Sequence, residues 1–205
     1  FMRIGIDIDD VIAKTGQIFY QKINERFGTE VDFTKVPYYN WVDKQVFKKG
    51  YSADEFYGFL NEFQTSSPYH ETLALRRGFK EIVKKLYRKG HIIYLISNRH
   101  VLILPYTTVW LKNLGILPYI SGVLHNSYME KPFSQFKIRE ARRLKIEVFL
   151  EDALDYALPL AKNKIKVILF DRPWNQKKDL PKNIYRVDDW QQAEKIIKKL
   201  ETVKA

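Results

Sequence analysis

The chain has 205 residues, enough to bury a sizeable core in one large domain or in one domain that carries an insertion. Its 45% hydrophobic and 15% aromatic content excludes a disordered chain. Its lack of cysteine excludes disulfides and thiolate chemistry. No apolar stretch reaches the roughly 20 residues that cross a bilayer. The formal net charge of +11 favours anionic partners, but the lysines are spread along predicted helices rather than gathered in one block.

The first predicted element is a short strand that ends in three carboxylates. The apolar run Ile4 to Ile8 is interrupted by Asp7 and followed by Asp9 and Asp10. A carboxylate in a buried strand is costly unless the strand end opens into a site. In open α/β sheets, ligands bind just beyond the carboxyl ends of the strands. The stretch therefore indicates either a metal or phosphoryl-transfer centre or an Asp-rich turn that caps the next helix.

The next segment, residues 15–71, predicts a small helical insertion. Apolar spacing indicates a helix over residues 16–27, which ends at Gly28. The following stretch is rich in aromatic residues and shows no clear strand. Ser52 and Glu55 form a capping-box pattern that opens a helix to about Phe63. We expect this insertion to lie over the end of the first strand.

From Gly78 onward the pattern alternates regularly between helix and strand. Such alternation implies right-handed crossovers and a parallel sheet. The sequence thus predicts a doubly wound α/β fold, with a core of residues 2–14 and 72–205. The predicted strands cover residues 91–96, 120–124, 148–150, 166–170 and 185–187. The predicted helices cover residues 79–88, 105–114, 134–144 and 189–200, with one more that follows the fourth strand and leads to Lys164.

Polar side chains follow three of these strands. Asp7 and Asp9 follow the first, Ser97 follows the second, and Glu151 and Asp152 follow the fourth. A doubly wound topology brings these strand ends to one edge of the sheet. Carboxylates that repel one another need a cation, and oxygen ligands without cysteine favour Mg²⁺. The three strand ends together favour catalysis over turn capping.

These motifs resemble those of the haloacid dehalogenase (HAD) superfamily phosphatases. The resemblance rests on Asp-Ile-Asp-Asp-Val at the first strand, Ser97 after the second, a lysine before the fourth and Glu151-Asp152 at its end. It covers residues 2 to about 171, with the motifs in the expected order, and the insertion resembles a C1-type cap. The opening and the segment Leu169-Phe-Asp-Arg-Pro-Trp-Asn175 are closer to the 5′-nucleotidase type C and 5′(3′)-deoxyribonucleotidase-like group.

The resemblance implies a HAD-like, Rossmannoid fold and a role for each motif residue. Asp7 would be the nucleophile, and Asp9 would protonate the leaving group and later deprotonate the attacking water. Mg²⁺ would be held by Asp7, the backbone carbonyl of Asp9 and Asp152, with Glu151 or Asp155 nearby through water. Ser97, with the adjacent Asn98, would bind phosphate oxygens. Asp10 would orient the turn.

Two lysines match the lysine motif. Lys137 falls in the first turn of the helix before the fourth strand, and Lys131 stands in Glu-Lys-Pro-Phe. We favour Lys137 as the phosphate-binding lysine and keep Lys131 as the alternative.

Side chains that contact the rest of the substrate are harder to identify. Phe19, Tyr39 and Trp41 are candidates for stacking on a base, although most aromatic residues of a small cap form its own core. Arg99 follows the motif serine and is a further candidate, with a solvated loop as the other interpretation.

The leading hypothesis is a cytoplasmic, Mg²⁺-dependent phosphomonoesterase without a signal peptide or a membrane partner. Its small phosphorylated substrate would be a (deoxy)nucleoside monophosphate, as for a 5′(3′)-nucleotidase. A second hypothesis keeps the mechanism and makes the substrate a sugar phosphate or another small ester, because the superfamily does not fix the substrate. A third is a non-enzymatic protein that binds nucleic acid or an acidic partner, which the charge favours but no nucleic-acid-binding signature supports. The sequence leaves the oligomeric state open.

Overall fold

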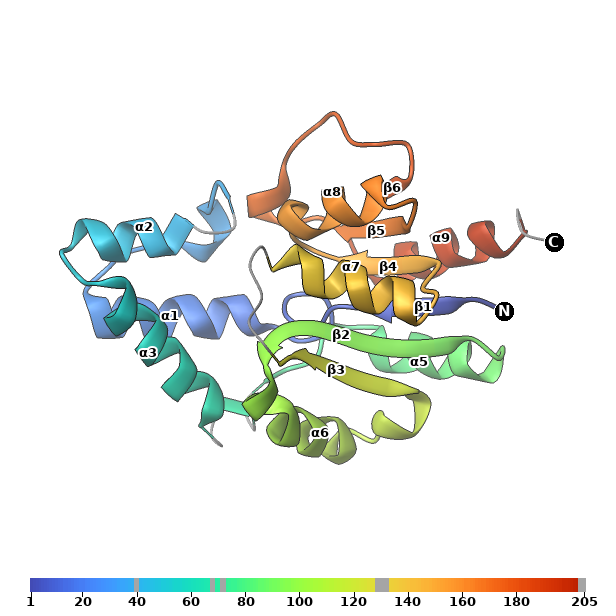
Figure 1. Ribbon diagram of the computed structural model, residues 1–205, viewed down its shortest axis with the longest axis horizontal. Helices are drawn as coiled ribbons and strands as arrows, with labels where there is room; N and C mark the ends of the chain where they lie inside the picture. The colour runs from blue at the N-terminus through green and yellow to red at the C-terminus, as the bar shows by residue number, and fades with distance from the viewer. Residues whose placement is uncertain (39–40, 67–68, 71–72, 128–132, 203–205) are drawn as a thin grey trace.

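The computed structural model describes residues 1–38, 41–66, 69–70, 73–127 and 133–202, and these contain a parallel sheet of six strands in the order β3-β2-β1-β4-β5-β6 (Figure 1). The order reverses at β1, whose neighbours are β2 on one side and β4 on the other. A ligand site is expected outside this switch point. The strands are β1 (Arg3–Ile6), β2 (Ile92–His100), β3 (Gly122–Asn126), β4 (Val148–Glu151), β5 (Lys166–Phe170) and β6 (Ile184–Val187).

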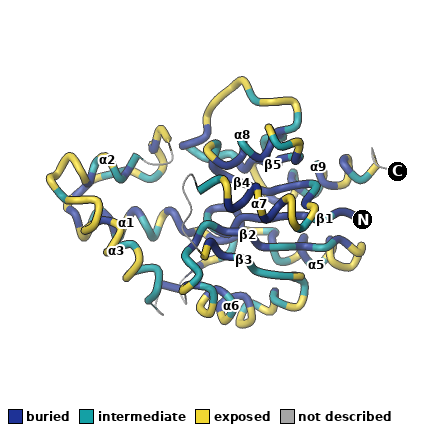
Figure 2. The backbone as a smooth tube through the Cα atoms, in the orientation of Figure 1, coloured by how far each residue is buried: buried dark blue, intermediate teal, exposed yellow. Residues whose placement is uncertain are grey.

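Helices cover both faces of the sheet, so the predicted doubly wound, HAD-like α/β fold is confirmed. One face packs against α5 (Phe79–Arg88), α6 (Leu104–Asn113) and α9 (Trp190–Thr202). The other packs against α7 (Ser134–Arg143) and α8 (Leu154–Lys162). Because both faces are covered, the central strands β1, β4 and β5 are almost entirely buried, whereas β2, β3 and β6 are buried in part (Figure 2). Ile4 and Ile6 join the first core, and Gly5 between them faces Phe149 of the second.

The helical insertion contains α1 (Thr15–Phe27), α2 (Trp41–Lys48) and α3 (Ala53–Thr65), which share a separate hydrophobic cluster. In Figure 1 they lie beyond one end of the sheet, far from the two chain termini. We call them the cap. The predicted capping box is present: the Ser52 backbone N–H donates to Glu55 at 2.8 Å, and the Glu55 N–H donates to Ser52 Oγ at 3.2 Å.

Two backbone hydrogen bonds tie the chain leaving β1 to the chain returning from the cap. Lys14 N donates to Ala74 O at 2.9 Å, and Arg76 N donates to Ile12 O at 2.8 Å. The predicted boundary at residue 72 lies outside the described residues, and the exact domain limits remain a prediction.

Several elements differ from the sequence-based expectation, among them β3, which begins at Gly122 and ends at Asn126 rather than covering residues 120–124. β2 does not end at residue 96; it continues to His100 with a register shift after Ser97, because Ser97 and His100 still pair with His125 and Asn126 of β3. Helix α2 was not predicted as a separate element. Among the described residues, no helix is both long and apolar enough to cross a membrane.

Candidate active site

Asp7 lies directly beyond β1, on the same face of the sheet as Gly5 and α7. Its backbone N–H still donates to Leu150 O at 3.0 Å, which fixes it beside β4. Its buried carboxylate lies 3.0 Å from Lys137 Nζ, through Oδ1. The same ammonium group lies 2.7 Å from Glu151 Oε2, so one lysine from α7 connects the ends of two neighbouring strands.

Asp7, Glu151 and Asp152 form a buried carboxylate cluster, in which one oxygen of each lies within 4.8 Å of the others. Glu151 Oε1 accepts hydrogen bonds from the backbone N–H groups of Asp152 and Ala153, at 3.1 and 3.3 Å. The indole N–H of Trp174 donates to Asp152 Oδ2 at 3.0 Å. These bonds hold the carboxyl groups in place rather than letting them separate.

The charge balance of the cluster suits a hard divalent cation. Burial raises the pKa of Asp7 to about 8, although the positive charge of Lys137 opposes this, and burial together with Glu151 raises the pKa of Asp152 well above its usual value. One lysine does not balance three carboxylates. Oxygen donors at this spacing fit Mg²⁺, which prefers carboxylate and water ligands. Asp7 and Asp152 would hold the ion, because Glu151 is already engaged by Lys137 and two backbone amides.

Asp9 is not a member of this cluster and pairs with Arg99. The Arg99 guanidinium donates from Nη2 to Asp9 Oδ1 at 2.6 Å and from Nε to Oδ2 at 2.9 Å. Arg99 is itself buried and also donates from Nη1 to Thr107 Oγ1 at 3.2 Å. Burial pushes the pKa of Asp9 upward, but the charge and hydrogen bonds of Arg99 hold it below its usual value. Asp9 is thus a firmly oriented carboxylate next to the cluster.

Asp10 orients the turn between β1 and α1. It adopts a left-handed backbone conformation with φ of 53°, which Asp tolerates better than most residues. Its carboxylate accepts a hydrogen bond from Gly16 N at 2.9 Å and forms an ion pair with Arg76 Nη2 at 2.6 Å. Arg172 Nη2 donates to the Asp10 carbonyl at 2.6 Å. These contacts hold the turn between β1 and α1 in place.

Ser97 and Asn98 lie on the irregular end of β2. Ser97 Oγ lies 3.5 Å from Asp9 Oδ2 and accepts from Arg99 N at 3.3 Å. Asn98 Oδ1 accepts from Asn126 Nδ2 at 3.4 Å. A hydroxyl and an amide therefore stand beside the carboxylates, where they can donate to an anion.

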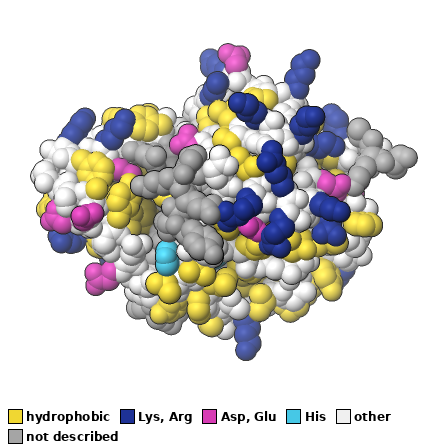
Figure 3. All heavy atoms as spheres, in the orientation of Figure 1, with side chains coloured by type: hydrophobic (Ala, Val, Ile, Leu, Met, Phe, Trp, Pro, Cys, Tyr) yellow, Lys and Arg dark blue, Asp and Glu magenta, His cyan; other side chains and the backbone are white. Residues whose placement is uncertain are grey.

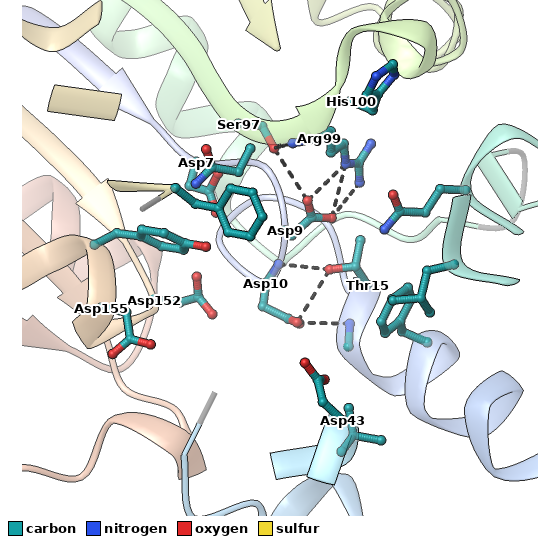
Figure 4. A pocket seen from close by; sticks show the side chains of 18 of the residues that line it. Asp7, Asp9, Asp10, Thr15, Asp43, Ser97, Arg99, His100, Asp152 and Asp155 are labelled. Carbon is teal, nitrogen blue, oxygen red and sulfur yellow. Dashed lines mark hydrogen bonds and ion pairs between the residues drawn. The ribbon is translucent and has the colours of Figure 1, made fainter. Parts of the chain in front are cut away.

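A cavity of about 670 Å³ opens above these residues, between the core and the cap (Figure 4). Residues predicted for the site that line it are Asp7, Asp9, Phe19, Ser97, Asn98, Arg99, Lys137, Asp152 and Asp155. Glu151 lies below the surface of the cavity, fully buried. Trp41 lines a separate hollow on the cap with Lys48 and Lys49 and does not reach this cavity. Tyr39 and Lys131 lie outside the described residues.

Several lining residues were not predicted. Asp43, Tyr57, Asn61 and Gln64 reach the cavity from the cap, and Tyr156 reaches it from α8. The Tyr156 ring lies 4.4 Å from Lys137 Nζ. The cap helices carry polar residues among buried aromatic side chains. In the sequence, such polar residues look the same whether they line a cavity or face solvent, so they could not be assigned to the site.

A doubly wound sheet with a buried carboxylate cluster at its switch point and a helical cap above it defines a hydrolase of the HAD type. The family model for "5′ nucleotidase, deoxy (pyrimidine), cytosolic type C protein" matches residues 1–203, and the chain belongs to this family. It is accordingly a nucleotidase-like phosphoric monoester hydrolase.

One curated relative has a similar sequence, and solved structures have the same fold. The chain is 31% identical over 143 residues to a nucleotidase from Clostridium acetobutylicum, a match that covers 68% of this chain and 69% of that protein. Among solved structures, a predicted phosphatase from Clostridium acetobutylicum superposes with a TM-score of 0.72 at 10% identity, covering 97% and 99% of the two chains. A Bacillus subtilis protein assigned to the HAD hydrolases and bound to magnesium superposes with a TM-score of 0.64 at 13% identity, covering 96% and 99%.

Proposed function

We propose that the protein is a Mg²⁺-dependent phosphomonoesterase that acts through an aspartyl-phosphate on Asp7. The observation that carries this proposal is the buried group of Asp7, Lys137, Glu151 and Asp152 at the ends of β1 and β4, with Asp9 beside it. A nucleophile, cations and a second carboxylate within one cavity are the parts that phosphoryl transfer requires.

The roles follow from the positions of the side chains. Asp7 attacks phosphorus, and the bond from phosphorus to the ester oxygen breaks. Asp9, which Arg99 keeps ionised in the free protein, takes up a proton when the ester binds and gives it to the departing alkoxide. Asp9 then takes a proton from the water that attacks the phosphorus of the acyl phosphate, which releases phosphate and restores Asp7. Lys137 and the Ser97 hydroxyl donate to the phosphate oxygens, where preorganised donors stabilise developing charge.

Asp7 and Asp152, with the backbone carbonyl of Asp9, would hold Mg²⁺. The ion would supply positive charge beside the phosphate and keep the buried Asp7 ionised as a nucleophile. The magnesium bound by the Bacillus subtilis relative of the same fold supports this choice of ion.

We infer that the substrates are (deoxy)nucleoside monophosphates, cleaved in the cytoplasm. The family description and the Clostridium acetobutylicum nucleotidase support this, as does a cavity large enough for a nucleoside and partly lined by aromatic side chains such as Phe19. A sugar phosphate or another small ester is the second candidate. Family membership favours either enzyme over a protein that only binds nucleic acid.

The test is turnover of a panel of nucleotides, sugar phosphates and p-nitrophenyl phosphate, with the Asp7→Asn variant beside the wild type. We expect the wild type to release phosphate fastest from nucleoside monophosphates and Asp7→Asn to be inactive on every ester, because an amide is not a nucleophile here. Asp179→Asn, the same change at an exposed loop residue, is the control and should keep full activity. An active Asp7→Asn enzyme contradicts the mechanism, and equal rates on all esters contradict the nucleotide preference.

A further inference from the structure

Asp43 is a carboxylate that the catalytic chemistry does not use, yet it lines the active-site cavity from the cap. It lies in the first turn of α2, where an acidic residue commonly stabilises a helix from the solvent side. Here its side chain instead points into the cavity, toward the side of Asp10, while Ser97 lies at the opposite edge (Figure 4).

The surroundings leave part of the acceptor capacity of Asp43 unused. The Tyr57 hydroxyl donates to Asp43 Oδ2 at 3.3 Å. Within the part of the chain that the structure describes, no lysine or arginine forms an ion pair with Asp43. An ionised carboxylate offers about four lone-pair sites. The Tyr57 hydroxyl and the backbone N–H of Asp43 itself fill two of these sites, so the half-buried carboxylate can still accept from a donor on a ligand.

The cap side of the cavity is mixed rather than purely apolar. Phe19, Tyr20 and Phe33 supply ring surface, and the nearby cap helix α3 supplies Asn61 and Gln64. Ring surface with a few placed polar groups is typical of a site that fixes the orientation of an organic ligand. The phosphate-binding residues lie on the core, so a bound ester would direct its alcohol half toward this wall.

We propose that Asp43, oriented by Tyr57, accepts a hydrogen bond from an N–H or O–H group on the alcohol half of the phosphate ester. This inference rests on the proposed function. A nucleoside offers such donors on its base amino group or its sugar hydroxyls. The same carboxylate repels an alcohol half that carries a carboxylate or a second phosphate, so Asp43 selects uncharged, donor-bearing leaving groups.

The test compares Asp43→Asn with Glu62→Gln, which makes the same carboxylate-to-amide change on the exposed side of α3. The substrates are adenosine monophosphate, its analogue without the base amino group, its 2′,3′-dideoxy analogue, p-nitrophenyl phosphate and phosphoglycolate. The measured quantity is the ratio of kcat/KM for adenosine monophosphate to that for each other ester. If Asp43→Asn no longer prefers adenosine monophosphate over the analogue without the amino group, the base supplies the donor. If it no longer prefers adenosine monophosphate over the dideoxy analogue, the sugar supplies it.

In Asp43→Asn we expect the ratio of adenosine monophosphate to p-nitrophenyl phosphate to fall by on the order of tenfold to a hundredfold, the range for a hydrogen bond to a charged group. The ratio to phosphoglycolate should fall further, because the repulsion is removed. Glu62→Gln should leave both ratios unchanged. Equal losses on all five esters, or unchanged ratios, would overturn the proposal, since a purely structural role predicts no change in preference.

A binding measurement separates this proposal from the proposed function. Calorimetry of adenosine monophosphate with the Asp7→Asn protein in the presence of a chelator, with and without Asp43→Asn, reports the contact without turnover, because the proposed reaction needs Mg²⁺. If the added Asp43→Asn change weakens binding at least tenfold, the Asp43 contact is supported, even if Asp7→Asn proves active and the nucleophile assignment fails. Equal affinities overturn the Asp43 contact even if Asp7→Asn is inactive as expected.

Discussion

Lys137 is a buried ammonium group, 1% exposed, whose charge depends on its neighbours. Burial alone would lower its pKa, but the carboxylates of Asp7 and Glu151 raise the pKa above the usual lysine value. The ion pairs in turn hold the Asp7 oxygen and the end of β4 in one position. Removing one partner from such a buried group leaves an uncompensated charge, which costs about 3–5 kcal/mol. Lys137 therefore acts on both the geometry and the charge of the cluster.

His125, at the end of β3, predicts an acid-sensitive fold. Its buried ring interacts through Nδ1 with His100 O at 3.2 Å, and burial, with the charge of Arg99, lowers its pKa to about 4. A histidine in the unfolded chain takes up a proton near pH 6.5, whereas the folded protein resists it until about pH 4. The contribution of His125 is thus intact above pH 6.5 and is lost as the pH falls from 6.5 to 4.

Through His125 alone, the free energy of unfolding should fall by on the order of 2 kcal/mol between pH 6.5 and pH 5. Urea unfolding at pH 7.5 and pH 5 measures it in the wild type and in His125→Gln, which keeps a donor for His100 O but does not titrate. The variant should show a pH dependence that is smaller by this amount. A wild type and a variant with parallel pH profiles would contradict the assignment.

At the scale of elements, two glycines predict opposite effects of the same substitution. Gly58 lies inside α3, and no other group lies within 4 Å of the point that an alanine methyl would occupy, so Gly58→Ala should stabilise the protein by about 0.5–1 kcal/mol through helix propensity. Gly5 lies inside β1, where a Cβ would come within 2.7 Å of the Phe149 ring. Gly5→Ala should therefore destabilise the protein by about 1–3 kcal/mol.

Both values come from chemical denaturation followed by circular dichroism, with the two variants measured side by side. Because β1 leads directly into Asp7 and is central in the sheet, Gly5→Ala should also reduce phosphatase activity, while Gly58→Ala should not alter the cluster. If Gly58→Ala destabilised the protein, or Gly5→Ala left its stability unchanged, the packing around these two glycines would differ from that described above.

Elements with a regular apolar period were predictable from the sequence, and those defined by tertiary contacts were not. The bounds of α5 and β5 agree with the prediction because each is a clean apolar pattern ended by a polar or glycine signal. The extension of β2 to His100 was missed because polar residues suggested a turn. They remain in the strand because β3 supplies backbone partners and the sheet edge is open to the cavity.

The residues at the strand ends could be predicted from the fold class alone. Any doubly wound sheet with this strand order brings Asp7, Ser97 and Asp152 to the same edge. The partners of those residues were not. Arg99 meets Asp9 across 90 positions of the chain, and Trp174 meets Asp152 across 22. Such pairs depend on how loops close over the sheet, which local patterns do not encode. Asp43 was missed because the orientation of α2 decides whether its carboxylate faces solvent or the cavity.

Across the whole molecule, the surface and the site carry opposite charge. The net charge is +11, and lysine and arginine side chains are scattered over the face shown in Figure 3. The cavity floor instead gathers Asp7, Asp9, Asp10 and Asp152. A basic exterior raises the local concentration of phosphorylated substrates. The acidic interior would repel them without a cation, so binding of the metal and binding of the substrate are expected to be coupled.

This arrangement predicts that Mg²⁺ stabilises the folded protein. At a concentration 100 times its Kd, an ion that binds only the folded state adds about 2.7 kcal/mol, and a chain of this size gains roughly 2–4 °C in Tm for each kcal/mol. Scanning calorimetry should therefore show a rise of about 5–10 °C over protein treated with a chelator. Asp152→Asn should abolish the rise, and the exposed Asp179→Asn should keep it.

The rise should also depend on pH. Because burial raises the pKa of Asp7 to about 8 and that of Asp152 above its usual value, protons compete with the ion, so the rise should shrink from pH 8.5 to pH 5.5. An equal rise in Asp152→Asn would place the ion elsewhere.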